Sequence, residues 1–245
     1  MFGLPKAESG HPQKGASMSS WLSLCLNELK GYGFNPSFIL DIGAYKGKWT
    51  AEASTIFPHS GFFLIEANPH PELEGLNHDH LITLLSDTER EVDFYQNGGT
   101  GDSYLKETTS HFKDREPIRR KAKTLDSVVG DLRLTTDNES VNEKGFDLIK
   151  IDCQGAEIDI LKGGEKTVSL CDVLILEAPF AGTYNKGAPS FAEYIAYVDK
   201  IGFTPFEFAG FTRWRDITFQ VDIAFIRKES DVLKKINGKI KDFGK

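Results

Sequence analysis

Short apolar runs, separated by amphipathic or polar segments, follow one another along most of the chain. Short runs rich in β-branched and aromatic residues predict strands, and apolar residues spaced three and four apart predict helices. The predicted strands cover 38–42, 62–66, 81–85, 91–96, 146–152, 173–177, 203–211 and 221–227; the predicted helices cover 19–30, 48–53, 156–163 and 191–201, and another begins at 124. Alternation of strands and helices from 38 to 185 predicts an α/β fold with a largely parallel sheet.

The two ends of the chain differ in composition from its middle. Residues 1–17 are rich in Gly, Pro, Ser and charge, which predicts a flexible lead-in, and the basic tail 229–245 is expected to fray. We expect a single domain over 18–228, made of a leading helix at 19–30, a cofactor-binding half at 36–130 and a substrate-binding or closing half at 146–228.

Composition and charge exclude several classes of protein. The net charge of −7 and the pI of about 5.4 argue against a general nucleic-acid binder. Three cysteines without metal-like spacing favour a reducing, cytoplasmic compartment. The polar N-terminal segment predicts no secretory signal, and no apolar run is long enough to predict a membrane span.

A glycine-interrupted turn after the first strand predicts a nucleoside site. The pattern Asp41-x-Gly43-x-x-x-Gly47 joins an apolar strand to a helix, and the second strand ends in Glu66, where an acid can accept hydrogen bonds from ribose hydroxyls. The spacing lacks the third glycine of a dinucleotide fingerprint. An acid at the turn favours a cationic, phosphate-free ligand, S-adenosylmethionine, over a nicotinamide dinucleotide; an oxidoreductase is the alternative.

Four predicted strands end in an acid. Ligands of an open parallel sheet bind outside the carboxyl ends of its strands, near the point where strand order reverses. Unpaired carboxylates are costly to bury, so we expect these acids to lie outside the core and to line one cleft. The four residues are Asp41, Glu66, Asp152 and Glu177.

The segment from Asp147 to Gly163 (DLIKIDCQGAEIDILKG) resembles the signature of FkbM-type methyltransferases. Other motifs agree with it in order: the Asp41–Gly47 turn, Glu66-Ala67-Asn68-Pro69, Gly101-Asp102-Ser103, Thr124-Leu125-Asp126, Leu174 to Glu177 and Val221 to Phe225. The resemblance covers about residues 36–228. It implies a class I (Rossmann-like) sheet of seven mostly parallel strands with an antiparallel last strand and helices on both faces. It also implies S-adenosylmethionine as methyl donor and, usually, O-methylation of a hydroxyl on a saccharide or natural product.

Within this hypothesis each motif receives a role. Backbone at Gly43, Ala44, Tyr45 and Gly47 approaches the cofactor, and Asp41 binds its ammonium directly or through water. Glu66 holds the ribose beside Ala67 and Asn68, while Leu85 and Ser86 border the adenine. Asp152 faces the transferred methyl group or the acceptor hydroxyl and is the first candidate base; the weaker candidates are Glu157 and Glu177.

Several alternatives stay open. A magnesium-assisted mechanism would use Asp152 and Glu177, but Ala178-Pro179 follows where an amide ligand would be wanted, so we expect no metal. A nucleophilic Cys153 lacks a histidine beside it in sequence.

The basic segment 111–123 is either a solvated surface or the mouth of a site for an anionic substrate. A non-catalytic binding module would have a filled cleft. The loops 97–122 and 179–190 are expected to choose the acceptor, and the oligomeric state cannot be read from the sequence.

Overall fold

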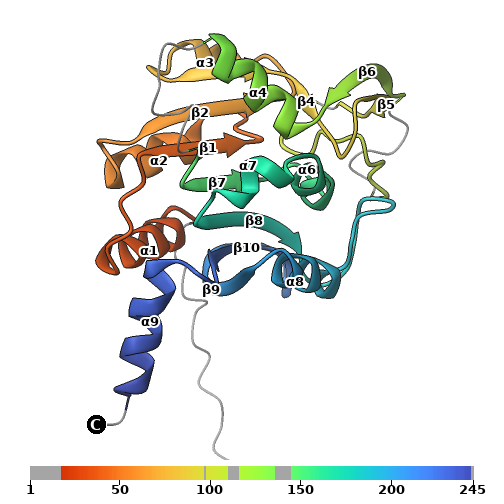
Figure 1. The fold of residues 1–245 in the computed structure, drawn as a ribbon. Helices are drawn as coiled ribbons and strands as arrows, with labels where there is room; N and C mark the ends of the chain where they lie inside the picture. The colour runs from red at the N-terminus through yellow and green to blue at the C-terminus, as the bar shows by residue number, and fades with distance from the viewer. Residues whose placement is uncertain (1–17, 97, 110–115, 136–144, 244–245) are drawn as a thin grey trace, which may run out of the picture.

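The computed structural model describes residues 18–96, 98–109, 116–135 and 145–243, which form an α/β structure around one large sheet (Figure 1). The sheet has seven strands in the order β3-β2-β1-β7-β8-β10-β9. They are β1 (Phe38–Ile42), β2 (Gly61–Glu66), β3 (Asp79–Ile82), β7 (Leu148–Ile151), β8 (Val173–Pro179), β9 (Phe203–Trp214) and β10 (Ile217–Arg227). β10 runs antiparallel to β8 and β9, and the other pairs are parallel. The predicted class I sheet is confirmed.

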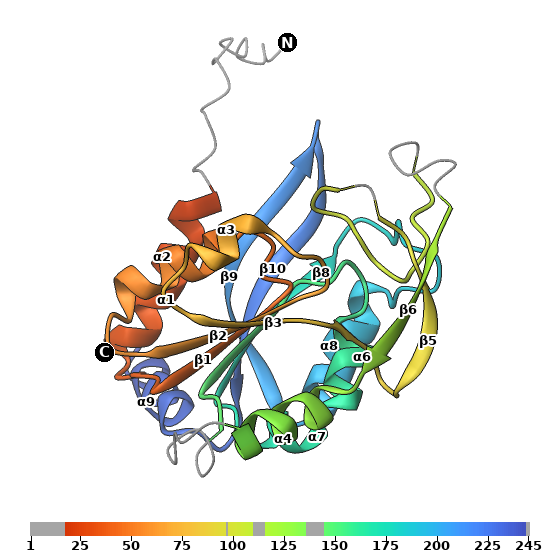
Figure 2. The same ribbon diagram turned by 90° about the horizontal axis from the view of Figure 1, so that it is seen from above.

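Helices cover both faces of this sheet, as Figure 2 shows from above. One face carries α1 (Met18–Gly31), α2 (Lys48–Ile56), α3 (Pro71–Glu74) and α9 (Asp231–Lys241). The opposite face carries α4 (Leu125–Thr135), α6 (Glu157–Gly163), α7 (Glu165–Ser169) and α8 (Phe191–Lys200). Successive strand residues point to opposite faces, so Ile39 packs in one core cluster and Leu40 in the other.

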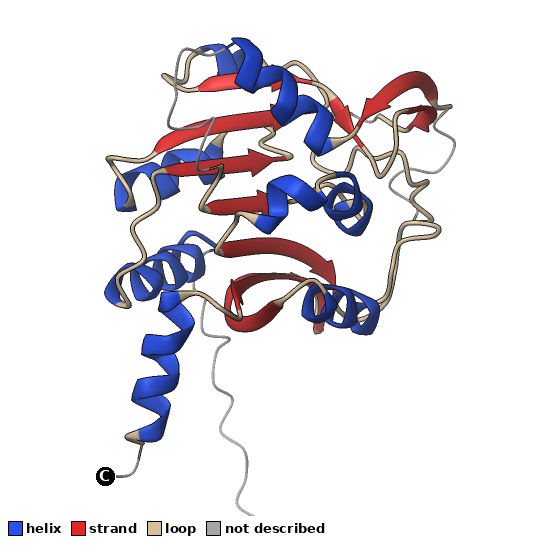
Figure 3. Cartoon of the chain, in the orientation of Figure 1, coloured by secondary structure: helices blue, strands red, loops and turns tan. Residues whose placement is uncertain are grey.

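A second, three-stranded sheet was not predicted. It consists of β4 (Leu84–Leu85), β6 (Ile118–Lys123) and β5 (Arg90–Phe94), and Figure 3 shows it beside the carboxyl ends of the large sheet. The single strand predicted over 81–85 is divided at Thr83, whose backbone N–H donates to the Glu66 carbonyl at 2.8 Å. β3 then pairs with β2, whereas β4 pairs with β6. The second sheet has its own small apolar cluster, which includes Leu84 and Phe94.

The basic tail contains a helix, so the expectation that it frays is wrong for Asp231–Lys241. Ser230 caps this helix, its hydroxyl oxygen accepting from the Leu233 N–H at 3.2 Å, and Val232 is buried in the core cluster of that face. Residues 1–17 lie outside the described residues, and the proposed domain limits stay a prediction. No helix in the described parts of the chain has the length and apolar character needed to cross a bilayer.

Candidate active site

The turn after β1 is held by hydrogen bonds within the protein. The N–H groups of Gly43 and Ala44 both donate to the Ile65 carbonyl, at 2.9 and 3.3 Å, and the Gly47 N–H donates to the Ala44 carbonyl at 2.8 Å. The Tyr45 N–H donates to Glu66 Oε2 at 2.7 Å. These four backbone N–H groups therefore already have hydrogen-bond acceptors within the protein. The turn leaves space for a ligand but does not offer it the free amides that its glycines had suggested.

Gly43 is required by the neighbouring chain segment. Its φ of 73° is left-handed, and a Cβ atom there would lie 1.9 Å from the carbonyl oxygen of Asp152. The turn after β1 thus lies directly against the loop after β7. Gly47 precedes α2 and lies next to Leu76.

Asp41 lies in the core, which contradicts the expectation that it would face a cleft. It is fully buried, accepts from the Thr50 hydroxyl at 2.7 Å, and its Oδ1 lies 3.2 Å from Lys150 Nζ. Lys150 is the partner that makes this burial tolerable. Burial alone would lower the pKa of Lys150, but the carboxylates of Asp41 and Asp152 outweigh it and raise that pKa, so Lys150 is a charged structural residue.

Glu66 lies at the end of β2, as predicted, and is fixed in orientation. Its Oε2 accepts from Tyr45 and its Oε1 accepts from the Asn68 N–H at 2.9 Å. The Asn68 side chain in turn donates to Asp102 Oδ2 at 2.8 Å and accepts from Arg120 at 3.1 Å. A carboxylate and an amide are thereby presented side by side at the carboxyl end of the sheet.

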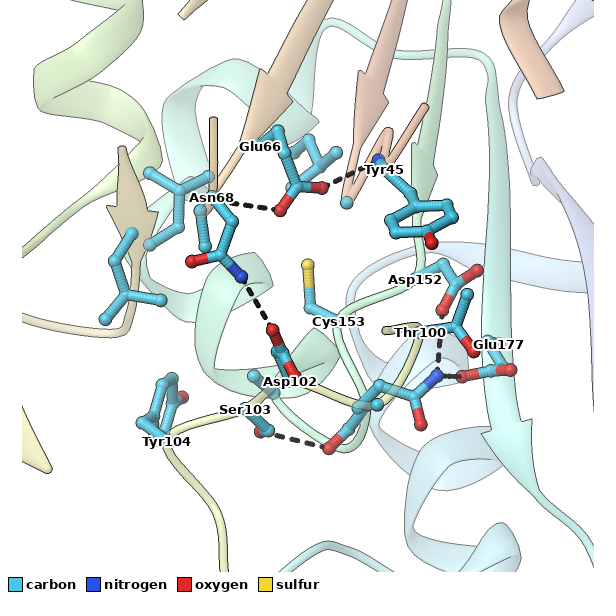
Figure 4. A pocket seen from close by; sticks show the side chains of 18 of the residues that line it. Tyr45, Glu66, Asn68, Thr100, Asp102, Ser103, Tyr104, Asp152, Cys153 and Glu177 are labelled. Atoms are coloured by element: carbon cyan, nitrogen blue, oxygen red, sulfur yellow. Dashed lines mark hydrogen bonds between the residues drawn. The ribbon is translucent and has the colours of Figure 1, made fainter. Parts of the chain in front are cut away.

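A cavity of about 440 Å³ opens at this end, where strand order reverses between β1 and β7 (Figure 4). Its apolar part is formed by side chains from both sheets, among them Ile65, Leu85 and Phe94. The described lining contains four carboxylates and no Lys, Arg or His. The four are Glu66, Asp102, Asp152 and Glu177.

Two of these carboxylates are joined by one amide. Gln154 Nε2 donates to Glu177 Oε2 at 2.7 Å and to Asp152 Oδ1 at 3.2 Å. Asp152 has a side chain 35% exposed, with Lys150 Nζ 3.6 Å from its other oxygen. Burial, followed by the charges of Asp152 and Asp222, raises the pKa of Glu177 well above its ordinary value. Glu177 therefore holds a proton more readily than an exposed glutamate.

Asp222 is a charged neighbour of the site that the sequence analysis did not single out. It lies on β10 directly opposite Glu177 in the strand register. Burial and the nearby Asp152 raise its pKa to about 7, against the lowering effect of Lys150. The signal in the sequence was one acid inside the apolar run 221–225, but its position beside Glu177 depends on a strand pairing that the run does not specify.

Glu157 supports the loop and does not line the cavity. It is fully buried, and its Oε1 accepts from the Cys153 N–H at 2.7 Å and the Gly155 N–H at 3.2 Å, while its Oε2 accepts from the Tyr194 hydroxyl. Burial raises its pKa to about 7. Burial also raises the pKa of the Cys153 thiol, which disfavours the thiolate that a nucleophile requires.

The structure brings together most, but not all, of the residues predicted from sequence. The cavity is lined by Gly43, Tyr45, Glu66, Ala67, Asn68, Leu85, Asp152 and Glu177. Among the remaining candidates, Ala44 and Ser86 are buried beside it, and Asp41, Gly47 and Glu157 also lie outside its lining. Lining residues that were not singled out for a role at the cavity include Phe94, Thr100, Gln154, Thr212 and Gln220.

The chain was compared with known families and structures. Residues 41–205 match the family model described as the methyltransferase FkbM domain. The chain belongs to the FkbM methyltransferase family. A search of curated proteins found no match.

Several solved methyltransferase structures resemble this FkbM-family chain at low identity. The 1,6-didemethyltoxoflavin-N1-methyltransferase of Burkholderia thailandensis is 12% identical, with 87% of this chain and 79% of that chain covered and a TM-score of 0.49. An S-adenosylmethionine-dependent methyltransferase of Clostridium acetobutylicum is 9% identical, with 87% and 93% covered and a TM-score of 0.47. The N-methyltransferase NodS of Bradyrhizobium japonicum is 11% identical, with 88% and 90% covered and a TM-score of 0.45.

The basic segment of this FkbM-family chain forms surface ion pairs where it is described. Arg119 pairs with Asp93 at 2.8 Å and Lys123 with Asp131 at 3.2 Å. Arg119 and Lys123 therefore fit the solvated-surface alternative, whereas Arg120 donates to Asn68 at the cavity; residues 111–115 lie outside the described residues. Among the described residues, no group of three His, Cys, Asp or Glu side chains is arranged to hold a metal ion.

Proposed function

We propose that this protein is an S-adenosylmethionine-dependent methyltransferase that methylates a hydroxyl group on a saccharide or natural product. The observation that carries the proposal is that one cavity combines an oriented Glu66, an apolar wall at Leu85 and a partly exposed Asp152. Its volume of about 440 Å³ falls within the range of roughly 300–1,000 Å³ for small-molecule sites. A non-catalytic module would instead have a filled cleft.

The residues present fit this cofactor better than a dinucleotide. Glu66 supplies two carboxylate oxygens for ribose hydroxyls, and Leu85 with Phe94 supplies an apolar surface for an adenine. A pyrophosphate needs free backbone amides or cations. The Gly43, Ala44, Tyr45 and Gly47 amides are already bonded, and the described lining has no cationic side chain. This set of groups favours a phosphate-free ligand.

Bound S-adenosylmethionine would supply an electrophilic methyl group. The protein's own task is to align an acceptor hydroxyl and to take its proton. We assign proton removal to Asp152, whose side chain is partly exposed at the cavity and has Lys150 behind it, and keep Glu177, whose pKa is raised by burial, as the second candidate. Lys150 balances the negative charge behind Asp152. We expect an uncharged acceptor, since the carboxylates of the lining would repel an anionic one.

Calorimetry with S-adenosylhomocysteine and with NAD tests the cofactor assignment. We expect binding of S-adenosylhomocysteine at micromolar concentration and none of NAD; binding of NAD alone would contradict the proposal. Mass spectrometry of candidate glycans and natural products incubated with labelled methyl donor would then find the acceptor. The variant Asp152→Asn should keep S-adenosylhomocysteine affinity and lose turnover, and full activity in it would exclude Asp152 as the base. A cytoplasmic location stays a prediction.

A further inference from the structure

Gln154 is held in an unusual backbone conformation at the centre of the site. Its φ of 54° is left-handed, a region that residues other than glycine rarely occupy. Two side chains from other segments fix its carbonyl: the Ser103 hydroxyl donates to it at 3.2 Å, and the Asn185 side-chain amide donates to it as well. Such a conformation persists where the surroundings hold it, and here they direct the side chain between two carboxylates.

The Gln154 side chain is part of a chain of hydrogen bonds in which each group donates to the next, ending at two carboxylates. Gln220 Nε2 donates to the Tyr184 hydroxyl oxygen, and that hydroxyl donates to Gln154 Oε1 at 2.9 Å. Gln154 Nε2 then donates its two hydrogens to Asp152 and Glu177. Only this orientation of the amide satisfies all partners, because its oxygen would otherwise face two carboxylates.

We propose that Gln154 is a positioning residue that holds Asp152 in place beside Glu177 for proton removal from the acceptor. The inference rests on the proposed function. One amide gives each carboxylate a hydrogen bond and so fixes the position of the two acids relative to each other. Tyr184, in the segment after β8, holds the amide in the required orientation and connects that segment to the base.

Other ionisable groups face the same pair, and Gln154→Met leaves all of them in place. They are Lys150 on β7, Asp222 on β10, Glu157 at the start of α6 and Tyr184. Without the amide donors, the pair Asp152–Glu177 should bind a proton more tightly, because two like charges remain with fewer donors.

The test follows the protonation of this pair in the S-adenosylhomocysteine complex by carboxyl ¹³C NMR, with assignments from Asp152→Asn and Glu177→Gln. Gln154→Met keeps the length of the side chain and removes both donors. We expect the pH at which the pair releases its proton to rise by about one unit or more, a tenfold change in proton affinity. Tyr184→Phe, which keeps the ring stacked on Phe219, should shift it in the same direction by a smaller amount.

Tyr197→Phe on α8, outside the cavity lining, is the matched control and should shift nothing. A proton-release pH in folded Gln154→Met equal to that of the wild type would overturn the inference. If Gln154→Met does not fold, an unshifted Tyr184→Phe has the same meaning. Once an acceptor is known, Gln154→Met should lower kcat and move the pH–rate profile to higher pH with little change in KM. If the wild type does not bind S-adenosylhomocysteine, the proposed function is rejected. The same NMR titration of the free protein then decides the role of Gln154 by the same criterion.

Discussion

Replacing Lys150 with methionine would test how the charges behind the site are balanced. The Lys150 side chain is 7% exposed, and its ammonium lies 3.2 Å from the fully buried Asp41 carboxylate. Methionine has a similar unbranched apolar stem and no charge. The variant therefore leaves Asp41 buried with the Thr50 hydroxyl as its remaining side-chain partner.

The expected loss of stability is large. Removing one member of a buried ion pair destabilises a protein by about 3–5 kcal/mol, because the other charge stays buried without compensation. At roughly 2–4 °C per kcal/mol for a chain of this size, the melting temperature should fall by about 6–20 °C. The double variant Asp41→Asn/Lys150→Met removes both charges and should recover much of the loss.

Urea unfolding at pH 7 of the wild type, both single variants and the double variant gives the coupling energy. The raised pKa of Lys150 means that the stability from its charged form is fully present below pH 10.5, its unfolded value, and is lost only at higher pH. Titration of Lys150 itself therefore contributes no difference between pH 6 and pH 8. A loss below about 1 kcal/mol in Lys150→Met, or a double variant no more stable than that single variant, would refute this reasoning.

Three further predictions concern other parts of the fold. Gly43→Ala should lower the melting temperature, because the new Cβ atom would meet the Asp152 carbonyl. Gly130→Ala in α4 is the control, since a Cβ there has open space, and it should raise the melting temperature slightly. Equal effects of the two variants would contradict the contact between Gly43 and Asp152. The pKa of Asp222 is raised from 3.8 to about 7, so its contribution to the free energy of unfolding is present below pH 3.8 and is lost as pH rises to 7. In urea unfolding, Asp222→Asn should therefore gain stability relative to the wild type between pH 5 and pH 8. A difference that does not depend on pH would argue against the shift. Ser230→Ala should speed amide hydrogen exchange in α9 by removing its cap, at a cost of about 1 kcal/mol, and unchanged exchange there would show that the cap contributes little.

The pattern of apolar runs predicted the large sheet well, since its central strands are buried on both faces and read as continuous apolar segments. It failed at 81–85, where two short strands join different sheets and no residue type marks the division at Thr83. It also failed for α9, because Val232 becomes buried only through contact with the rest of the fold.

Residues of the site were predicted where position along a strand was sufficient. Glu66 is the last residue of β2, Asp152 directly follows β7, and both line the cavity. Asp41 lies within β1, beside Lys150 of β7 in the strand register, and only that register shows that it faces a buried ammonium. The place of Asp222 likewise depends on the antiparallel pairing of β10 with β8, which a single sequence does not reveal.

The pairing of β1 with both β2 and β7 has a consequence for protein engineering. The segment expected to bind the methyl donor and the segment expected to bind the acceptor meet in the middle of one sheet, and Gly43 touches the Asp152 backbone across that boundary. Replacing either segment with the corresponding segment of a relative would disrupt the packing at this contact. New acceptor preferences are better sought at Thr212, which reaches the cavity from β9 at the opposite edge of the sheet.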